Sequence, residues 1–378
     1  MIQVFGSSVG QEELDEIKSS FDNQWLGSGP KVIQFEKKFS ERCGFKNFVM
    51  TDSASNSLYL AIKLLNLKPG SEIILPSFTF VSCAQAVIEN NCIPVFCDIE
   101  YTTQNVSYET IVPHFDNKKT GAIMVVHYAG LPVNINPILE LGVPIIEDCA
   151  HAVDSYFNGV HTGMLGDIGV FSFDSMKNLS CGEGGGITAS SPSFIEKIRR
   201  LRYCGIAKSG LDTSKEKERW WETNVIYSSL RHMPNDISAS ICLAQLQKLD
   251  TLQIKRKEIW DRYQSEFYEL HYSGKYPIWG WSVNKPPIDK INEYKHSYFT
   301  FFVMVDKRDD LAKHLLNNGI YTTLRYYPLH MTKIFNNHPC SLKNTESMNE
   351  CGLNLPMHPR LTDDNISYII DKIKEFYK

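Results

Sequence analysis

Four apolar segments in the first half of the chain end in small, polar or aromatic residues, and helical segments separate them. These segments are residues 48–50, 72–76, 121–126 and 143–146. Continuous apolar runs joined through helices are typical of a largely parallel sheet that is buried on both faces. Functional side chains in such sheets lie beyond the carboxyl ends of the strands. Ser53, Phe78, His127 and Asp148 all fall at such ends, so we expect a site there.

A lysine follows the next apolar run in an unusual setting. Residues 168–173 are apolar apart from Gly169 and Ser172, and Lys177 comes just before a cluster of four glycines within residues 182–186. The pattern predicts strand, loop and strand, with close backbone approach or positive φ at the glycines. A lysine normally keeps its ammonium group in water. Lys177 is therefore either an ordinary loop lysine or a partly desolvated amine that forms a Schiff base with an aldehyde cofactor.

Two strand ends carry groups that suit the rest of such a cofactor. Between a strand and a helix, Ser53 and Ser55 lie where backbone N–H groups face an anion such as phosphate, although serines also serve there as simple N-caps. Asp148 follows an apolar strand, and a buried aspartate needs a partner such as a cationic ring nitrogen. His151 is close enough in sequence to hydrogen-bond a ring substituent. The alternative is a helix-capping aspartate beside a packed histidine.

Composition excludes several other classes of function. The formal net charge of −4 gives no electrostatic case for nucleic-acid binding. Ten cysteines occur without a CxxC pair, and no Cys/His cluster has the spacing of zinc ligands, so we expect no metal site and a reducing compartment. The N-terminus lacks the pattern of a signal peptide, and no apolar run approaches the ~20 residues of a membrane span. We expect a cytoplasmic protein without a membrane segment.

The pattern changes in the last third of the chain, where a long helix over 236–270 is expected to join two domains. Beyond it the sequence predicts a strand over 298–305, a helix over 309–318, a strand over 320–327 and a final helix over 365–377. We therefore predict a large α/β domain over residues 1–245 and a smaller α+β domain over residues 246–378.

Four features together fit a pyridoxal 5'-phosphate (PLP) site: the phosphate cradle at Ser53–Ser55, the ring of Phe78, the carboxylate of Asp148 and the amine of Lys177. At these residues the sequence resembles the DegT/StrS family of sugar aminotransferases. The resemblance covers nearly the whole chain, and its motifs occur in the family's order. They include Pro76-Ser-Phe-Thr-Phe, Glu147-Asp-Cys-Ala-His-Ala, Gly166-Asp-Ile-Gly-Val-Phe-Ser-Phe, Lys177-Asn, Gly182-Glu-Gly-Gly, Met233-Pro-Asn and Leu355-Pro-Met-His-Pro.

This resemblance implies the type I aminotransferase fold, with a large α/β/α domain around a mostly parallel mixed sheet and a smaller C-terminal α+β domain. It implies three catalytic residues, namely Lys177 for the cofactor aldehyde, Asp148 for the pyridinium and His151 beside the ring hydroxyl. The same comparison places Phe78 on the ring and assigns phosphate binding to the backbone of Ala54 and Ser55 and to Ser172. Related dehydratases have a histidine in place of the lysine, so Lys177 favours transamination.

The family also implies L-glutamate as amino donor, a nucleotide-linked keto-deoxysugar (dTDP, UDP or GDP) as acceptor, and a homodimer with interface active sites. Two departures leave the acceptor open. Leu230 stands where the family often has Asn or Arg, and Arg325 stands where it often has His. Arg325 is either an exposed strand-end arginine or a residue that binds an anionic group on substrate or donor. The alternatives are therefore amination of a small phosphorylated ketone or keto acid, and a non-catalytic homologue that binds PLP.

Overall fold

The computed structural model describes residues 1–207, 221–274, 276–281, 288–335 and 340–378. Its main sheet has seven strands in the order β1-β9-β8-β5-β4-β2-β3. Their bounds are β1 (Phe48–Thr51), β2 (Glu72–Pro76), β3 (Ile93–Cys97), β4 (Thr120–Val126), β5 (Ile145–Asp148), β8 (Ile168–Ser172) and β9 (Gly185–Ala189). Neighbours are parallel except β9, which runs antiparallel to β1 and β8. The predicted mostly parallel mixed sheet is confirmed.

Helices cover both faces of this sheet because successive strand residues point to opposite sides. Ile73 and Leu75 pack into one core with helices α3 (Ala54–Leu65), α4 (Ser82–Glu89) and α7 (Pro192–Leu201). Ile74 lies on the other side, in a core with the short helices α5 (Tyr108–Ile111) and α6 (Asn136–Leu139). On that side a third core joins β1 and β8 to α2 (Pro30–Cys43) and α9 (Asp236–Tyr272). Strands β1, β5 and β8 are buried along their whole length, as their apolar runs predicted, whereas the edge strand β3 begins at the exposed Ile93.

A second sheet lies in the C-terminal part of the chain. Its order is β10-β12-β13, with bounds β10 (Ile278–Trp281), β12 (Phe301–Val305) and β13 (Gly352–Leu355). The helices of this part are α10 (Arg308–Asn317), α11 (Lys343–Cys351) and α12 (Asp363–Phe376). Apolar residues of α10, α12, β12 and β13 form a core of their own. This is the small α+β unit that the sequence predicted.

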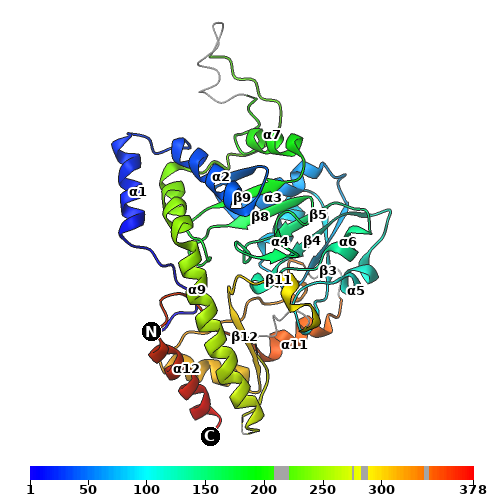
Figure 1. The fold of residues 1–378 in the computed structure, drawn as a ribbon. Helices are drawn as coiled ribbons and strands as arrows, with labels where there is room; N and C mark the ends of the chain where they lie inside the picture. Colours follow the sequence, from blue (N-terminus) through cyan, green and yellow to red (C-terminus); the bar gives the residue numbers. More distant parts are fainter. Residues whose placement is uncertain (208–220, 275, 282–287, 336–339) are drawn as a thin grey trace.

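Helix α9 runs from the main sheet to the small unit (Figure 1). Leu243 and Leu249 belong to the core of the large unit, whereas Ile259 and Phe267 belong to the core of the small one. The predicted boundary between residues 245 and 246 falls inside this helix, and it stays a prediction. The N-terminus departs from the prediction, since Ile2 packs against the core of the small unit.

Smaller elements complete the described chain. Helix α1 (Gln11–Asp22) lies beside the first half of α9, and β6 (Tyr156–Phe157), β7 (Val160–His161) and β11 (Tyr294–Lys295) form a third sheet. Single 3-10 turns occur at Val112–His114, Tyr128–Gly130, Ile288–Glu293 and Leu329–Met331. Among the described helices, none combines the length and the apolar character that crossing a bilayer requires.

The predicted strand over 320–327 is wrong. This segment forms only isolated bridges, Ile2 with Ile320 and Thr323 with Asn354, and otherwise runs without regular structure. Its Ile, Thr and Tyr residues are common in strands, but no strand in the described part of the chain pairs with it along its length. The irregular course brings Arg325 and Tyr326 from the small unit to the edge of the main sheet.

Candidate active site

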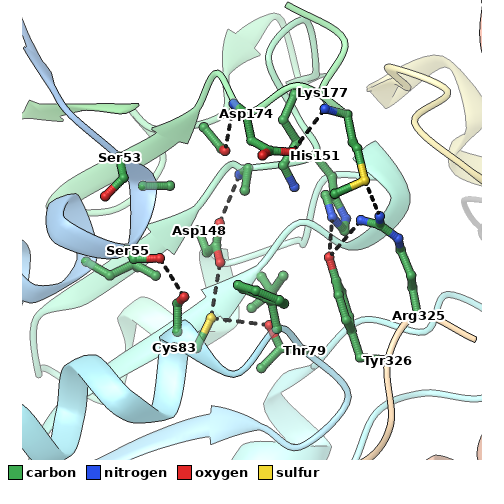
Figure 2. A pocket seen from close by; sticks show the side chains of 18 of the residues that line it. Ser53, Ser55, Thr79, Cys83, Asp148, His151, Asp174, Lys177, Arg325 and Tyr326 are labelled. Atoms are coloured by element: carbon green, nitrogen blue, oxygen red, sulfur yellow. Dashed lines mark hydrogen bonds between the residues drawn. The ribbon is translucent and has the colours of Figure 1, made fainter. Parts of the chain in front are cut away.

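A cavity of about 290 Å³ lies at the carboxyl ends of the parallel strands, near the lower end of the roughly 300–1,000 Å³ of small-molecule sites. The start of α3, the end of β5, the loop after β8 and residues 325–326 all contribute to it (Figure 2). Of the residues predicted from the sequence, the cavity brings together Ala54, Ser55, Asp148, His151, Ser172 and Lys177. These residues lie far apart in the chain, and the sheet topology places them at one edge.

Lys177 lies on the loop after β8, where its amine faces few polar groups. The Nζ atom lies 4.9 Å from the centroid of the Phe299 ring, and in the described part of the chain no hydrogen bond to it is found. Burial and, after it, the positive charge of Arg325 lower the pKa of Lys177 to about 8, although Asp148 and Asp174 oppose the shift. A substantial fraction of the amine is therefore neutral near physiological pH, as a nucleophile or a proton acceptor requires.

Asp148 ends β5, and two groups hold its carboxylate. Oδ1 accepts a hydrogen bond from the backbone N–H of Ala150 at 2.9 Å, and Oδ2 accepts one from the thiol of Cys83 at 3.1 Å. Cys83 belongs to α4, lines the cavity, and lies 3.2 Å from the hydroxyl of Thr79. No arginine or lysine forms an ion pair with Asp148 in the regions described. This buried carboxylate therefore remains available to a cationic group in the cavity.

His151 is fixed by contacts on three sides. Its Nδ1 accepts a hydrogen bond from the backbone N–H of Ala129 at 3.2 Å, so Nε2 carries the proton and donates to the hydroxyl of Tyr326 at 3.0 Å. The ring stacks on Phe299 with a centroid distance of 3.9 Å. Burial, together with the charges of Lys177 and Arg325, keeps the pKa of His151 well below its ordinary value. The residue is thus a neutral hydrogen-bonding group beside the cavity.

The start of α3 forms the end of the cavity that lies opposite Arg325 and Tyr326 (Figure 2). Ser53 is the N-cap, and its Oγ accepts a hydrogen bond from the backbone N–H of Asn56 at 3.2 Å. Ser55 pairs its hydroxyl with that of Ser82 at 2.6 Å. The capping alternative is therefore correct for Ser53, yet the N–H groups of Ala54 and Ser55 still lie at the positive end of a helix. Ser172, at the end of β8, lines the cavity as well.

A glycine of the main sheet makes this end of the cavity possible. Gly185 in β9 packs its α-carbon so closely against the backbone of Ser53 and Ala54 that a Cβ atom would collide with both residues. The Gly-rich return after Lys177 thus has a steric explanation at this position. It lets β9 lie directly under the start of α3, and so fixes the helix start relative to the lysine loop.

The structure corrects the prediction for Phe78. The ring of Phe78 is buried in a core with Tyr128 and Phe302 and does not line the cavity. Phe80, two residues later, lines it and has 51% of its surface exposed. Residues 77–81 form no strand after β2 ends at Pro76, so alternation along the motif did not indicate which ring faces the cavity.

His127 also falls outside the cavity, although it directly follows β4. Its Nε2 lies 2.9 Å from Oε2 of Glu147, and its Nδ1 accepts from the backbone of Val133. The ligand atoms of His127, Glu147 and Cys149 lie within 4.8 Å of one another, a grouping that resembles a metal site. However, both Glu147 oxygens already accept backbone N–H groups, from Gly163 at 2.8 Å and Gly166 at 2.6 Å. The group supports the strand ends and the loop before β8.

Sequence reasoning missed four cavity residues that now matter: Phe80, Cys83, Met176 and Tyr326. Two of them adjoin residues that were singled out, since Met176 precedes Lys177 and Tyr326 follows Arg325. Cys83 was not detectable, because a cysteine on an apolar helix face is ordinarily a core residue. Its position under Asp148 depends on how α4 packs against the main sheet.

The residues present fit PLP by their chemistry. A helix start suits a phosphate, a buried unpaired carboxylate suits a cationic ring nitrogen, and a lysine of lowered pKa suits an aldehyde. Together with the sheet topology, this arrangement defines the type I class of PLP-dependent enzymes. The model of the DegT/DnrJ/EryC1/StrS aminotransferase family matches residues 7–374, and the chain belongs to this family. It is a PLP-dependent aminotransferase.

Individual relatives agree with this assignment. The chain is 33% identical to a dTDP-4-dehydro-2,3,6-trideoxy-D-glucose 4-aminotransferase of Saccharopolyspora spinosa, over 99% of this chain and 96% of the relative. The crystal structure of the aminotransferase TlmJ from Streptoalloteichus hindustanus superposes with a TM-score of 0.90 at 34% identity, covering 99% and 98% of the two chains. An aminotransferase from Psychrobacter cryohalolentis shares the fold, with a TM-score of 0.90 at 22% identity and 98% coverage of both chains.

Proposed function

We propose that this aminotransferase transfers an amino group from L-glutamate to the keto group of a nucleotide-linked deoxysugar. The observation that carries transamination is the placement of Lys177 and Asp148 in one cavity with the start of α3. The name of the Saccharopolyspora relative supports the acceptor class, and a dTDP-linked 4-keto deoxysugar is the first acceptor to test. The product would serve synthesis of a surface glycan or a secondary metabolite.

Each cavity residue has a role in this proposal. PLP, when bound, supplies an electron sink that makes a proton on the amino-acid carbon easy to remove. The backbone of Ala54 and Ser55 and the hydroxyl of Ser172 would hold the phosphate, and Asp148 would hold the protonated ring nitrogen. Lys177, whose pKa is about 8, takes and returns a proton at Nζ. His151 would lie beside the ring hydroxyl as a neutral hydrogen-bonding group, and Phe80 would contact the ring.

The test is an absorbance spectrum of the purified protein before and after L-glutamate. We expect a band near ~410–430 nm to shift to ~330 nm as the cofactor passes from its aldehyde to its amine form. Adding the keto sugar should restore the first band. Lys177→Ala should bind PLP without turnover, and steady-state turnover by that variant would contradict the mechanism. If no amino donor converted bound PLP to its amine form, the alternative of a non-catalytic PLP-binding homologue would be favoured.

A second acceptor class is a small phosphorylated ketone or keto acid. Arg325 is the residue that favours it, because its guanidinium lines the cavity and can bind an anionic group of a compact substrate. Comparing kcat/KM for a dTDP-linked keto sugar, a phosphorylated ketone and a keto acid separates the two classes.

A homodimer whose partner completes the cavity is also part of this proposal. Apolar side chains are exposed beside the cavity, notably Phe80 and Leu230. Leu230 and Ser55 line a shallow surface pocket that adjoins the cavity at Ser55 and Ser82. Exposed apolar rings and side chains of this kind mark interaction surfaces. Sedimentation analysis of the wild type and of Leu230→Glu tests the dimer and its dependence on this surface.

A further inference from the structure

Arg325 is a cation in the cavity wall, and among the described residues it has no anionic partner. Its guanidinium carbon lies 3.8 Å from the centroid of the Phe5 ring and 5.8 Å from the rings of both Phe299 and Tyr326. Its hydrogen bonds go to weak or neutral acceptors, from Nη2 to Sδ of Met176 at 3.1 Å and from Nη1 to the Tyr326 hydroxyl at 3.5 Å. Within the described ranges no carboxylate lies within ion-pair distance of it.

Such a guanidinium is poorly satisfied by what surrounds it. An arginine keeps its charge at all physiological pH values and presents five N–H donors in a rigid fork. Aromatic rings on its face hold the group in place but accept none of the in-plane donors. A thioether sulfur and a hydroxyl at 3.5 Å leave most of these donors without a strong acceptor. The geometry is that of a prearranged site for a carboxylate or phosphate group.

The position of Arg325 in the cavity limits which anionic group it can bind. Figure 2 shows Arg325 and Tyr326 on one side of the cavity, and Ser53 and Ser55 on the other, with Asp148 between them. A cofactor phosphate bound at the start of α3 would therefore lie away from Arg325. The guanidinium is instead placed to meet a second anionic group, carried by a substrate, on the side where His151 and Lys177 lie.

We propose that Arg325 binds a carboxylate of the amino donor and thereby positions the donor's amino group toward Lys177. This rests on the proposed aminotransferase function, in which an amino acid must enter the cavity. The electrostatics agree, because the charge of Arg325 is the second cause, after burial, of the lowered pKa of Lys177. A group bound to Arg325 is thus close enough to act on the reacting amine. The phosphate of an acceptor shares this chemistry, and the two sources are separable by experiment.

The experiment compares the two half-reactions of the PLP-loaded enzyme, followed by cofactor absorbance, in the wild type, Arg325→Gln and Arg325→Lys. Arg262→Gln is the control, since Arg262 is a surface residue of α9 that pairs with Glu266 and does not line the cavity. In Arg325→Gln we expect the half-saturating L-glutamate concentration to rise about 10- to 100-fold, with Arg325→Lys intermediate. The affinity for PLP and the half-saturating keto-sugar concentration should stay within about twofold of the wild type.

A second measurement does not depend on turnover. Glutarate, a dicarboxylate without an amino group, is titrated calorimetrically into the PLP-loaded wild type and Arg325→Gln. Binding that weakens at least tenfold in Arg325→Gln supports a carboxylate site, and equal affinity in both proteins overturns it. If none of the amino acids tested converted the cofactor of the wild type to its amine form, the proposed function would be wrong. This titration would still decide whether Arg325 binds a carboxylate.

The remaining outcomes are equally decisive. If Arg325→Gln raised only the half-saturating concentration of a phosphorylated acceptor, the anion would be that phosphate and the proposal would be wrong. If both half-reactions were unchanged and the melting temperature fell, Arg325 would serve only to hold Phe5 and the N-terminal segment. That result would also overturn the proposal.

Discussion

The lowered pKa of Lys177 predicts how the apoprotein takes up PLP as pH changes. Burial and the positive charge of Arg325 bring this pKa to about 8, against an ordinary lysine value of about 10.4. At pH 7 about one amine in ten is then neutral, whereas an ordinary lysine would have about one in 2,500. Because only the neutral amine attacks an aldehyde, covalent uptake at pH 7 should be roughly 250-fold faster than an ordinary lysine allows.

The assay is stopped-flow absorbance of apoprotein mixed with PLP between pH 6 and pH 10, where the band near ~410–430 nm reports the covalent form. The same series with free Nα-acetyl-lysine, with each rate divided by the neutral fraction of its ε-amine, gives the pH dependence of PLP itself, which is then removed from the protein series. We expect the corrected rate to rise with pH, with a midpoint near 8, and then to level off. Arg325→Gln removes a positive charge that lowers the pKa of Lys177, so the midpoint of PLP uptake by this variant should move to higher pH. Asp174→Asn removes a negative charge that raises the pKa of Lys177, so the midpoint of PLP uptake by this variant should move to lower pH.

Two results would refute this reasoning. A midpoint near 10 in the wild type would show that Lys177 is solvated and unperturbed. Shifts of the same sign in Arg325→Gln and Asp174→Asn would show that the variants act through a change of structure, because the two charges have opposite effects on Lys177.

Substitutions at four further residues test the site and its support. Phe80→Ala should weaken PLP binding about fivefold in a PLP titration, with a change in the free energy of unfolding below ~1 kcal/mol, because the Phe80 ring is exposed in the cavity. Phe78→Ala should lower the free energy of unfolding by about 3–5 kcal/mol in urea, because the Phe78 ring is buried in a core. Cys83→Ala should weaken PLP binding about fivefold through loss of its hydrogen bond to Asp148, with Cys83→Ser restoring it. Asp236→Ala should lower the free energy of unfolding by about 2–4 kcal/mol, because its carboxylate accepts three backbone N–H groups at the start of α2.

The main sheet was predictable because its strands carry strong local signals. Unbroken apolar runs are typical of strands with both faces covered, and the helices between them require parallel pairing. The strand ends then place Ser55, Asp148 and Lys177 at one edge of the sheet, whatever the details of the loops. For these residues the order of elements along the chain is nearly sufficient, and the cavity contains all of them.

Side chains outside regular elements were harder to place. Phe78 and Phe80 have the same character and belong to one motif, and only the path of the chain after β2 decides which ring is buried. The segment over 320–327 looked like a strand, but its pairing depends on residues more than 25 positions away, such as Asn354 with Thr323. Long-range pairing of this kind has no local signature in a single sequence. Tyr326 and its hydrogen bond with His151 were therefore missed.

The effect of the Arg325 charge on the pKa of Lys177 gives the cavity a further property that can be tested. An anion bound to Arg325 offsets the positive charge that lowers the pKa of Lys177, so the amine becomes more basic when a carboxylate is present. Glutarate should therefore move the midpoint of PLP uptake by the wild-type apoprotein to higher pH and leave that of Arg325→Gln unchanged. If glutarate moved both midpoints equally, its effect would come from elsewhere in the cavity. A shift confined to the wild type would mean that the donor's carboxylate makes Lys177 a stronger base at the stage when it must accept a proton.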